Sequence, residues 1–409
     1  MRNSIVSFDN TEIAFSGKKN EDLNRAYWLF KMISYNWLVN ISPPFVNFAI
    51  WAHLPIKGLI RATAFRHFCG GENIEECTKT IDELGKYNIG AILDYSVEGK
   101  ESEADFDTGL EQILATIRRA KGDKHIPFSV FKPTGMARFG LLEKLNAKKD
   151  LTKQEQAEFE RVRQRFETIC RTGFENSVPI MIDAEETWIQ DVIDGLVTEM
   201  MMKFNKERVM VYNTIQMYRT DRLEFLKESY EHAVQHNYLI GMKIVRGAYH
   251  EKEQKRAAEK GYPSPVHAAK PATDKDYDDS LRFCVEHVDR IAVCAGTHNE
   301  NSSLLLTELM KEKNLPNNHP HIWYSQLYGM SDHISYNLSQ LGYNVCKYVP
   351  YGPVTAVLPY LIRRAQENTS VSGQVGRELS LILAEKKRRS DDKIKPTSSQ
   401  ASQELYAPH

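Results

Sequence analysis

Several signatures of secreted, metal-binding and nucleotide-loop proteins are missing from this sequence. Six cysteines are scattered among 409 residues, without a CxxC pair or a Cys/His group at zinc-site spacing. This argues against a disulfide framework and a zinc site, and it predicts a reduced intracellular compartment. A GxGxxG loop is absent, so a dinucleotide held on a Rossmann fold is not expected. His232 and His236 lie four residues apart but lack the HExxH pattern, and we expect no metal.

An excess of charge of either sign is missing as well. The chain carries 53 basic and 54 acidic residues, for a formal net charge of −1. This balance offers no general attraction to nucleic acid or to an anionic membrane. We therefore expect no nucleic-acid partner.

The sequence also lacks a recognisable targeting or membrane-spanning segment. Residues 1–19 have no apolar core and include acidic residues, which predicts neither a signal peptide nor a transit peptide and indicates a cytoplasmic protein. Residues 32–56 are uncharged and long enough to span a bilayer, but a Pro-Pro pair at Pro43 interrupts them. We expect two short buried helices there.

What is present is an alternation of short apolar runs with helical segments. Residues 18 to about 80 show helical spacing, with Asn20 as the expected N-cap. Eight apolar runs follow at intervals typical of βα units, at residues 89–94, 126–132, 178–185, 208–216, 240–247, 291–298, 321–327 and 344–350. Fully apolar strands between helices predict a parallel sheet covered on both faces, and eight such units predict a closed barrel.

The predicted fold is therefore α/β, a (β/α)8 TIM-type barrel with an N-terminal helical extension. We expect an N-terminal helical segment over residues 1–85 and a catalytic barrel over residues 86–375. A polar helical insert at about 141–173 is expected to be a solvated helix, an arm outside the barrel. Residues 376–409 are expected to form a C-terminal helix and a disordered tail, with the KKRR run at 386–389 solubilising the end of the helix.

Every expected strand ends in a residue that can ionise or hydrogen-bond. In chain order these are Asp94 with Glu98, Lys132, Asp183, Gln216, Lys243 with Arg246, Thr297 with His298, Gln326, and Tyr348. Chemistry in such barrels lies at the carboxyl ends of the strands. Burying a full ring of polar groups costs free energy unless they meet a ligand or one another, so the ring predicts a binding site. Taken alone, Asp94 is equally well explained as a helix cap.

A second polar cluster follows the last strand. Tyr360, Arg363, Arg364 and Glu367 are spaced i, i+3, i+4 and i+7, so they share one helix face. Adjacent guanidinium groups bind carboxylates and phosphates through paired hydrogen bonds. This face predicts an anion site beside the barrel mouth.

Together these motifs resemble the proline dehydrogenase family over about residues 89–370. The matching pieces are DYSVE (94–98), FK (131–132), IDAEE (182–186), KIVRGAY (243–249), GTHN (296–299), Gln326 and YVPYGPVTAVLPYLIRRAQEN (348–368). The resemblance implies a monofunctional, FAD-dependent enzyme that oxidises L-proline to Δ1-pyrroline-5-carboxylate, the first step of proline catabolism. It also implies a quinone electron acceptor and peripheral association with the inner face of a membrane.

The resemblance further assigns roles by position. It implies catalytic roles for Asp183, Lys243 and Tyr348. It implies substrate binding by Lys132, Tyr360, Arg363 and Arg364, and a gate ion pair between Glu98 and an arginine of the closing helix. The implied cofactor-binding residues are Ala184, Gln216, Arg246, Gly247, Ala248, Lys270, Thr273, Thr297, His298, Gln326 and Glu367.

One position departs from the family pattern, because Lys243 stands where many bacterial members carry arginine. Lysine keeps the charge and loses the guanidinium fork. The long insert after the second strand resembles the eukaryotic-type branch of the family. Three alternatives stay open: FAD-dependent oxidation of hydroxyproline or another cyclic amino acid, a Schiff-base aldolase with Lys132 or Lys243 as nucleophile, and a non-catalytic scaffold that binds a ligand.

Overall fold

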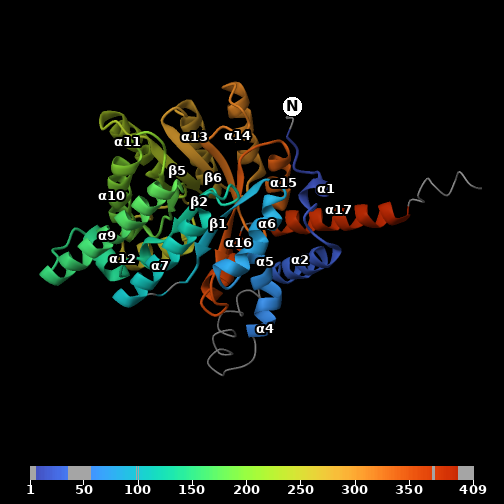
Figure 1. Cartoon of the computed structure of the whole chain (residues 1–409), viewed down its shortest axis with the longest axis horizontal. Helices are drawn as coiled ribbons and strands as arrows, with labels where there is room; N and C mark the ends of the chain where they lie inside the picture. Colours follow the sequence, from blue (N-terminus) through green and yellow to red (C-terminus); the bar gives the residue numbers. More distant parts are fainter. Residues whose placement is uncertain (1–5, 36–56, 98, 100, 371–373, 395–409) are drawn as a thin grey trace, which may run out of the picture.

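A closed barrel of parallel strands forms the centre of the molecule (Figure 1). The computed structural model describes residues 6–35, 57–97, 99, 101–370 and 374–394. The strands, paired in chain order with β8 closing onto β1, are β1 (Ile89–Tyr95), β2 (Phe128–Phe131), β3 (Ile180–Ile182), β4 (Val211–Gln216), β5 (Ile240–Val245), β6 (Ile291–Gly296), β7 (Ile322–Leu327) and β8 (Val345–Tyr351). Each apolar run coincides with one strand, and the (β/α)8 prediction is confirmed.

The strands are buried on both faces, which explains why their sequences do not alternate between apolar and polar residues. An apolar cluster fills the barrel and includes Ile92, Phe128 and Tyr212. The rings of Phe128 and Tyr212 pack edge to face with their centroids 5.4 Å apart. Cys294 and Cys346 belong to the same cluster, as expected for core residues, and all six cysteines are free.

Helices follow the strands and surround the barrel (Figure 1). They are α7 (Glu103–Ala120), the 3-10 turn η2 (Pro133–Gly135), α8 (Phe139–Asn146), α9 (Lys153–Asn176), α10 (Thr187–Phe204), α11 (Arg222–Gln235), α12 (His250–Lys260), α13 (Lys270–Glu286), α14 (Glu300–Glu312), α15 (Asp332–Gln340) and α16 (Leu358–Ser370). Ser102, Thr152 and Asn299 cap α7, α9 and α14 by accepting a backbone N–H. These caps fix where each helix starts.

The helical insert expected at about 141–173 is part of the outer layer of the barrel. α9 buries Val162, Phe166 and Ile169. The Phe166 ring packs edge to face on Phe131 of β2, with centroids 5.0 Å apart. α9 is therefore the crossover helix between β2 and β3, and the expectation of a solvated outer arm is wrong. Its apolar stripe is narrow and sits in a strongly charged stretch, which concealed the packing.

Helices from both ends of the chain pack together beside the barrel (Figure 1). They are α1 (Thr11–Ala14), α2 (Asn20–Ile33), α4 (Lys57–Ile60), the π-helical turn η1 (Arg61–Phe65), α5 (Arg66–Phe68), α6 (Ile74–Gly85) and α17 (Gln374–Ile394). A second apolar core joins α2, α16 and α17, with Phe30, Tyr360 and Ile382 among its members. The N-terminal helical extension is confirmed, and Lys19 rather than Asn20 is the N-cap of α2.

The KKRR run holds the two ends of the chain together. Arg389 donates hydrogen bonds to the backbone carbonyls of Phe15 and Lys18, each at 2.9 Å. It also pairs with the buried Glu385 at 2.7 Å. The expectation that this run merely solubilises the end of the helix is therefore wrong for Arg389.

Some expectations fall outside the described residues. These are the helices expected within residues 36–56, the gate residue Glu98 and the tail over residues 395–409, and the side chain of Glu367 is also outside the description. Across the part of the chain that is described, no helix is both long and apolar enough to cross a membrane.

Candidate active site

Charged side chains from four strand ends and a phenol from a fifth meet at the mouth of the barrel. Asp183, directly after β3, accepts hydrogen bonds from Lys243 of β5 and from the hydroxyl of Tyr348 of β8, the latter at 2.7 Å. The ammonium of Lys132, directly after β2, lies 2.7 Å from Asp94 of β1 and 3.1 Å from the Tyr348 hydroxyl. Parallel strands end at the same edge of a barrel, so residues far apart in sequence meet there. Two carboxylates, two ammonium groups and a phenol thus form a charge-balanced cluster.

Asp94 belongs to this cluster rather than to a helix start. Its side chain is 1% exposed and accepts hydrogen bonds from Lys132 and Ser96. The next helix, α7, is capped by Ser102 instead. The helix-cap interpretation of Asp94 is therefore wrong.

The surroundings of Asp183 and Tyr348 define where the protons lie. Burial opposes ionisation of Asp183, but the ammonium groups of Lys243 and Lys132 hold its pKa below the ordinary value. Burial and the charges of Asp183 and Asp94 raise the pKa of Tyr348 well above its ordinary value. Tyr348 is therefore a neutral donor and Asp183 a carboxylate acceptor around neutral pH. The Tyr348 ring also lies 5.1 Å from the Lys243 ammonium, within cation–π range.

Arg246 is held by residues of the outer helices. It donates to Asp274 of α13 at 2.6 Å, to the Thr297 hydroxyl at 2.7 Å and to Ser302 of α14 at 2.9 Å. Two of the predicted cofactor residues, Arg246 and Thr297, are thus in direct contact. Asp274 was missed from the sequence; the available signal was its i, i+4 spacing from Lys270, with which it pairs at 2.6 Å.

A buried glutamate beside the mouth was also missed. Glu185 accepts hydrogen bonds from the backbone N–H of Thr134 at 2.7 Å and from the Thr134 hydroxyl at 3.0 Å. Burial raises the pKa of Glu185 to about 7. The IDAEE motif contains this residue, but its sequence gives no sign of which acid turns inward.

The predicted cofactor residues near β4 form a hydrogen-bonded turn. The side chain of Gln216 donates to the carbonyl of Glu185 at 2.7 Å and accepts from the backbone of Ala248 at 3.1 Å. Gly247 has φ of 125°, and a Cβ there would lie 2.4 Å from the Tyr218 ring. Only glycine fits at this point, and the backbone of Gly247 and Ala248 is exposed.

The predicted residues near β6 and β7 are also connected. Gln326 donates to the carbonyl of Thr297 at 3.1 Å and accepts from Ser335 at 2.8 Å. His298 Nδ1 lies 2.9 Å from the Ser331 hydroxyl, and burial lowers the His298 pKa well below its ordinary value. Ser331 directly precedes α15, a position where serine is often a helix cap, but its side chain contacts His298 and does not cap the helix.

The remaining predicted residues lie on two helices. Lys270 and Thr273 occupy the first turn of α13, which carries no acidic residue and begins without a side-chain cap in the described structure. On α16, the Arg364 guanidinium lies 5.4 Å from the centre of the Tyr360 ring. The positive charge of Arg364 is among the causes that lower the pKa of His298. Tyr360 is 5% exposed and belongs to the second apolar core.

Comparison with known proteins decides the family. The model of the family described as proline dehydrogenase matches residues 77–377, a stretch that contains all eight strands and the residue cluster at the mouth. The chain belongs to the proline dehydrogenase family. This confirms the family and the enzyme class expected from the motifs.

Relatives within and beyond the named proline dehydrogenases share much of the chain. The protein named carbapenem antibiotics biosynthesis protein CarD, from Pectobacterium carotovorum subsp. carotovorum, is 37% identical over 79% of this chain and 83% of its own length. Proline dehydrogenase 1, mitochondrial, of Dictyostelium discoideum is 31% identical over 95% of this chain and 76% of its own length. The human protein of the same name is 38% identical over 62% of this chain and 42% of its length.

Solved structures agree with the fold. Proline utilization A from Bdellovibrio bacteriovorus, inactivated by N-propargylglycine, superposes with a TM-score of 0.71 over 90% of this chain at 19% identity. Proline utilization A from Corynebacterium freiburgense gives a TM-score of 0.64 over 80% of this chain at 18% identity. The chain spans 40% and 33% of the length of these proteins, and at such identity the likeness supports the barrel fold alone.

Proposed function

We propose that this member of the proline dehydrogenase family oxidises L-proline to Δ1-pyrroline-5-carboxylate, the first step of proline catabolism, with FAD as cofactor at the barrel mouth. The cluster of Asp183, Lys243, Tyr348 and Lys132 carries the proposal, because it gathers ionised and neutral donors and acceptors where barrels of this type perform chemistry. The relatives named proline dehydrogenase support the same substrate.

The residues around the mouth fit FAD. The exposed backbone at Gly247 and Ala248 leaves room for a flat ring to approach closely. The start of α13, where the structure shows no side-chain cap and which carries Lys270 and Thr273, suits a pyrophosphate, since a helix N-terminus and a lysine bind phosphate oxygens. Asp274 lies nearby, and Lys270 and Arg246 both offset its charge. The other proposed cofactor contacts are Ala184, Gln216, Thr297, His298, Gln326 and Glu367.

In the proposed reaction, FAD would supply the acceptor for the hydride that leaves C5 of proline, and the proline nitrogen gives up its proton to solvent as the C5=N double bond forms. Arg363 and Arg364 bind the substrate carboxylate as guanidinium groups do, with the ammonium of Lys132 close to the same space. Tyr348, with Tyr360, forms the wall beside the substrate ring. The positive charge of Lys243 stabilises negative charge that develops at the mouth.

Access to the site and the route of the electrons complete the proposal. Glu98 and an arginine of α16 form a gate ion pair over the substrate. A quinone is the electron acceptor, and the protein lies in the cytoplasm, peripherally at the inner face of the membrane. On α2, Trp28 is 60% and Met32 48% exposed, with Lys31 5.3 Å from the Trp28 ring. A stripe of this composition suits a bilayer interface.

The deciding experiment is an anaerobic spectrum of the purified protein. We expect a yellow protein whose flavin absorbance is bleached by L-proline and not by D-proline. A yellow protein whose flavin is not bleached by L-proline would indicate that the substrate is an analogue of proline. A protein that stays colourless after FAD is added would overturn the proposal.

Hydroxyproline or another cyclic amino acid is the second candidate substrate. The relative named for carbapenem biosynthesis, which is 37% identical to this chain, favours testing it, because its name does not point to proline. Bleaching by trans-4-hydroxy-L-proline at lower concentrations than by L-proline would support this alternative. A lysine aldolase is less well supported, because Lys132 and Lys243 both have their side-chain nitrogens engaged with carboxylates. Borohydride trapping tests it directly.

A further inference from the structure

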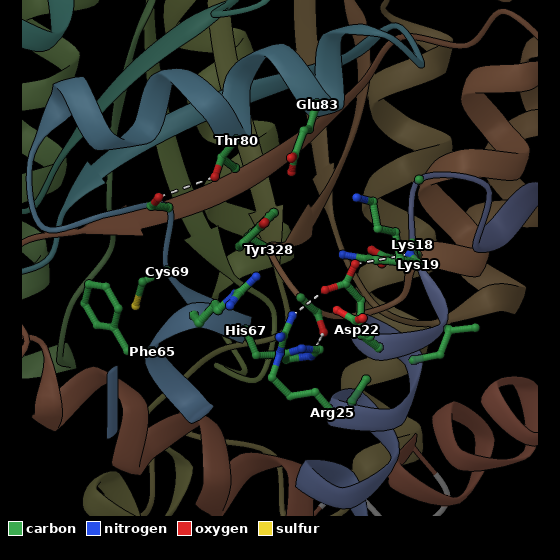
Figure 2. A pocket seen from close by; sticks show the side chains of 18 of the residues that line it. Lys18, Lys19, Asp22, Arg25, Phe65, His67, Cys69, Thr80, Glu83 and Tyr328 are labelled. Carbon is green, nitrogen blue, oxygen red and sulfur yellow. Dashed lines mark hydrogen bonds and ion pairs between the residues drawn. The ribbon is translucent and has the colours of Figure 1, made fainter. Parts of the chain in front are cut away.

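A cavity of about 410 Å³ lies outside the barrel, between the N-terminal helices and the loop that follows β7. Figure 2 shows Lys18, Lys19 and Asp22 on one side of it and Phe65 and Cys69 on the other. Tyr328, the residue after β7, lies between the two sides (Figure 2). The cavity has the size of sites that hold small organic ligands.

The cavity combines an apolar wall with charged groups. Leu23, Phe30, Phe65 and Ile382 contribute buried apolar side chains from α2, η1 and α17. Such a wall suits an apolar body, because its burial removes hydrocarbon surface from water.

Most of the charged groups that line the cavity already have partners. Arg25 pairs with Asp22 at 2.5 Å, and Lys18 lies 3.5 Å from Asp332. Other pairs are Arg61 with Glu76 at 3.4 Å and Lys79 with Glu83 at 3.9 Å. The charges of these paired groups are largely offset by their partners, so they contribute little to binding a charged ligand.

Two cations stand apart from these pairs. Lys19 and Arg66 are exposed at the cavity, and neither side chain forms an ion pair within the described part of the chain. Glu21 is an exposed lining carboxylate without an ion pair in the described residues, while Glu378, which also lines the cavity, is buried and accepts a hydrogen bond from the backbone N–H of Ser331. Among the exposed groups left for a ligand, two cations thus stand against one carboxylate, and a guanidinium binds a carboxylate through paired hydrogen bonds.

The cavity wall is linked to the barrel mouth through the loop of residues 328–331. On the cavity side, the ring Nε2 of His67 donates to the carbonyl of Gly329 at 2.8 Å, since burial lowers the His67 pKa to about 4 and the ring is neutral. On the other side, the Ser331 hydroxyl lies 2.9 Å from His298. His67 is thus connected to His298, a proposed cofactor residue, through two contacts: its own with Gly329 and that of Ser331 with His298.

We propose that this cavity is a second ligand site, which binds a small organic carboxylate with an apolar body and communicates with His298 through the loop of residues 328–331. Lys19 and Arg66 receive the carboxylate, and the apolar wall receives the body. The binding itself does not depend on the reaction proposed for the barrel mouth.

Hydrogen exchange read by mass spectrometry tests the site with benzoate as the probe and benzamide as its uncharged counterpart. We expect benzoate to protect backbone amides in residues 17–30, 61–69 and 328–331, and benzamide to protect none of them at the same concentration. Protection confined to the barrel mouth, or no protection at millimolar benzoate, would overturn the proposal.

Paired variants locate the carboxylate. The double variant Lys19→Gln/Arg66→Gln should weaken benzoate binding by about tenfold or more, the loss expected for charge-assisted hydrogen bonds. Lys31→Gln, on the same helix but away from the cavity, is the matched control and should bind as the parent does. Lys19 and Arg66 are exposed and Lys31 is partly exposed, and a melting curve of each variant checks that folding is preserved. Unchanged benzoate binding in the double variant would contradict the assignment of Lys19 and Arg66 to the carboxylate. Equally weakened binding in Lys31→Gln would also contradict it, because the effect would then come from the general charge of this surface.

Discussion

At the scale of single residues, Asp183 is the member of the mouth cluster on which the others depend. It accepts from both Lys243 and Tyr348, so Asp183→Asn leaves two ammonium groups facing only Asp94. We expect proline-dependent flavin reduction to fall about 100-fold or more, as when a preorganised charged group is lost from an active site. Stopped-flow reduction under anaerobic conditions measures this.

The control for Asp183→Asn is Asp289→Asn, at an exposed position between α13 and β6. In this variant, L-proline should reduce the flavin at the parent rate. If Asp183→Asn keeps a rate within a few-fold of the parent while its circular dichroism is unchanged, the cluster is structural and not catalytic.

Glu185 gives the stability of the protein a pH dependence. Its pKa is raised from 4.5 to about 7 by burial. Between those values the folded chain keeps a proton that the unfolded chain has lost, so the free energy of unfolding falls as pH rises through this window. Glu185→Gln removes the titration and can still accept from Thr134. Between pH 4.5 and pH 8, the free energy of unfolding of the variant should therefore rise relative to that of the parent, by up to about 3 kcal/mol.

Urea unfolding at several pH values measures that difference. Glu231→Gln, at an exposed position of α11, is the matched control and should follow the parent at every pH. Parallel pH profiles for Glu185→Gln and the parent would show that Glu185 ionises near its ordinary pKa in the folded protein.

At the scale of elements, the turn after β5 depends on one glycine. Gly247 has φ of 125° and no room for a Cβ beside the Tyr218 ring. Gly261, after α12, also has positive φ of 73° but has nothing within 4 Å of a Cβ. Gly247→Ala should therefore cost more stability than Gly261→Ala, which carries only the conformational cost of about 1 kcal/mol.

Thermal unfolding of the two alanine variants makes the comparison, and FAD retention after gel filtration reports on the turn. We expect Gly247→Ala to lose cofactor and Gly261→Ala to keep it. Equal melting temperatures and equal flavin content would show that Tyr218 moves aside without consequence.

The elements themselves were largely predictable, and their contacts were not. Strands buried on both faces read as apolar runs such as residues 240–247, and this local pattern was enough to predict eight strands and a closed barrel. α9 shows the limit, because its buried stripe is diluted by charges that face solvent. Strand-end positions predicted which residues meet at the mouth, including Asp183 and Lys243, since parallel strands share one edge.

The partners of individual side chains could not be predicted, because they depend on distances between elements that no local pattern contains. Arg246 turns to Asp274, an acid on a helix whose position depends on the whole barrel. Ser331 contacts His298 instead of capping α15, which its sequence position alone does not reveal. The cavity beside α2 likewise arises only when the N-terminal helices and the loop after β7 are brought together.

At the scale of the whole molecule, Arg389 is one of the arginines of α17 that join the two ends of the described chain, beside Arg377, which pairs with Asp9 at 2.7 Å. Arg389 of α17 donates to the carbonyls of Phe15 and Lys18 and pairs with the buried Glu385, so it ties the last helix to the segment before α2. Arg389→Ala removes these charge-assisted hydrogen bonds and should lower the free energy of unfolding by about 2 kcal/mol. Lys387→Ala, two residues away and exposed, should leave it unchanged.

The part of the chain that is destabilised in Arg389→Ala shows whether Arg389 holds the two terminal segments together or stabilises the whole fold. Hydrogen exchange in Arg389→Ala should speed up in residues 6–35 and in α17, and stay at the parent rate in β1 and β8, because the barrel closes without either end. Since Lys18 lines the cavity, benzoate protection of residues 17–30 should weaken in the same variant. Exchange that speeds up evenly through the barrel would mean that the ends and the barrel unfold as one unit, and that Arg389 stabilises the whole fold rather than its terminal helices.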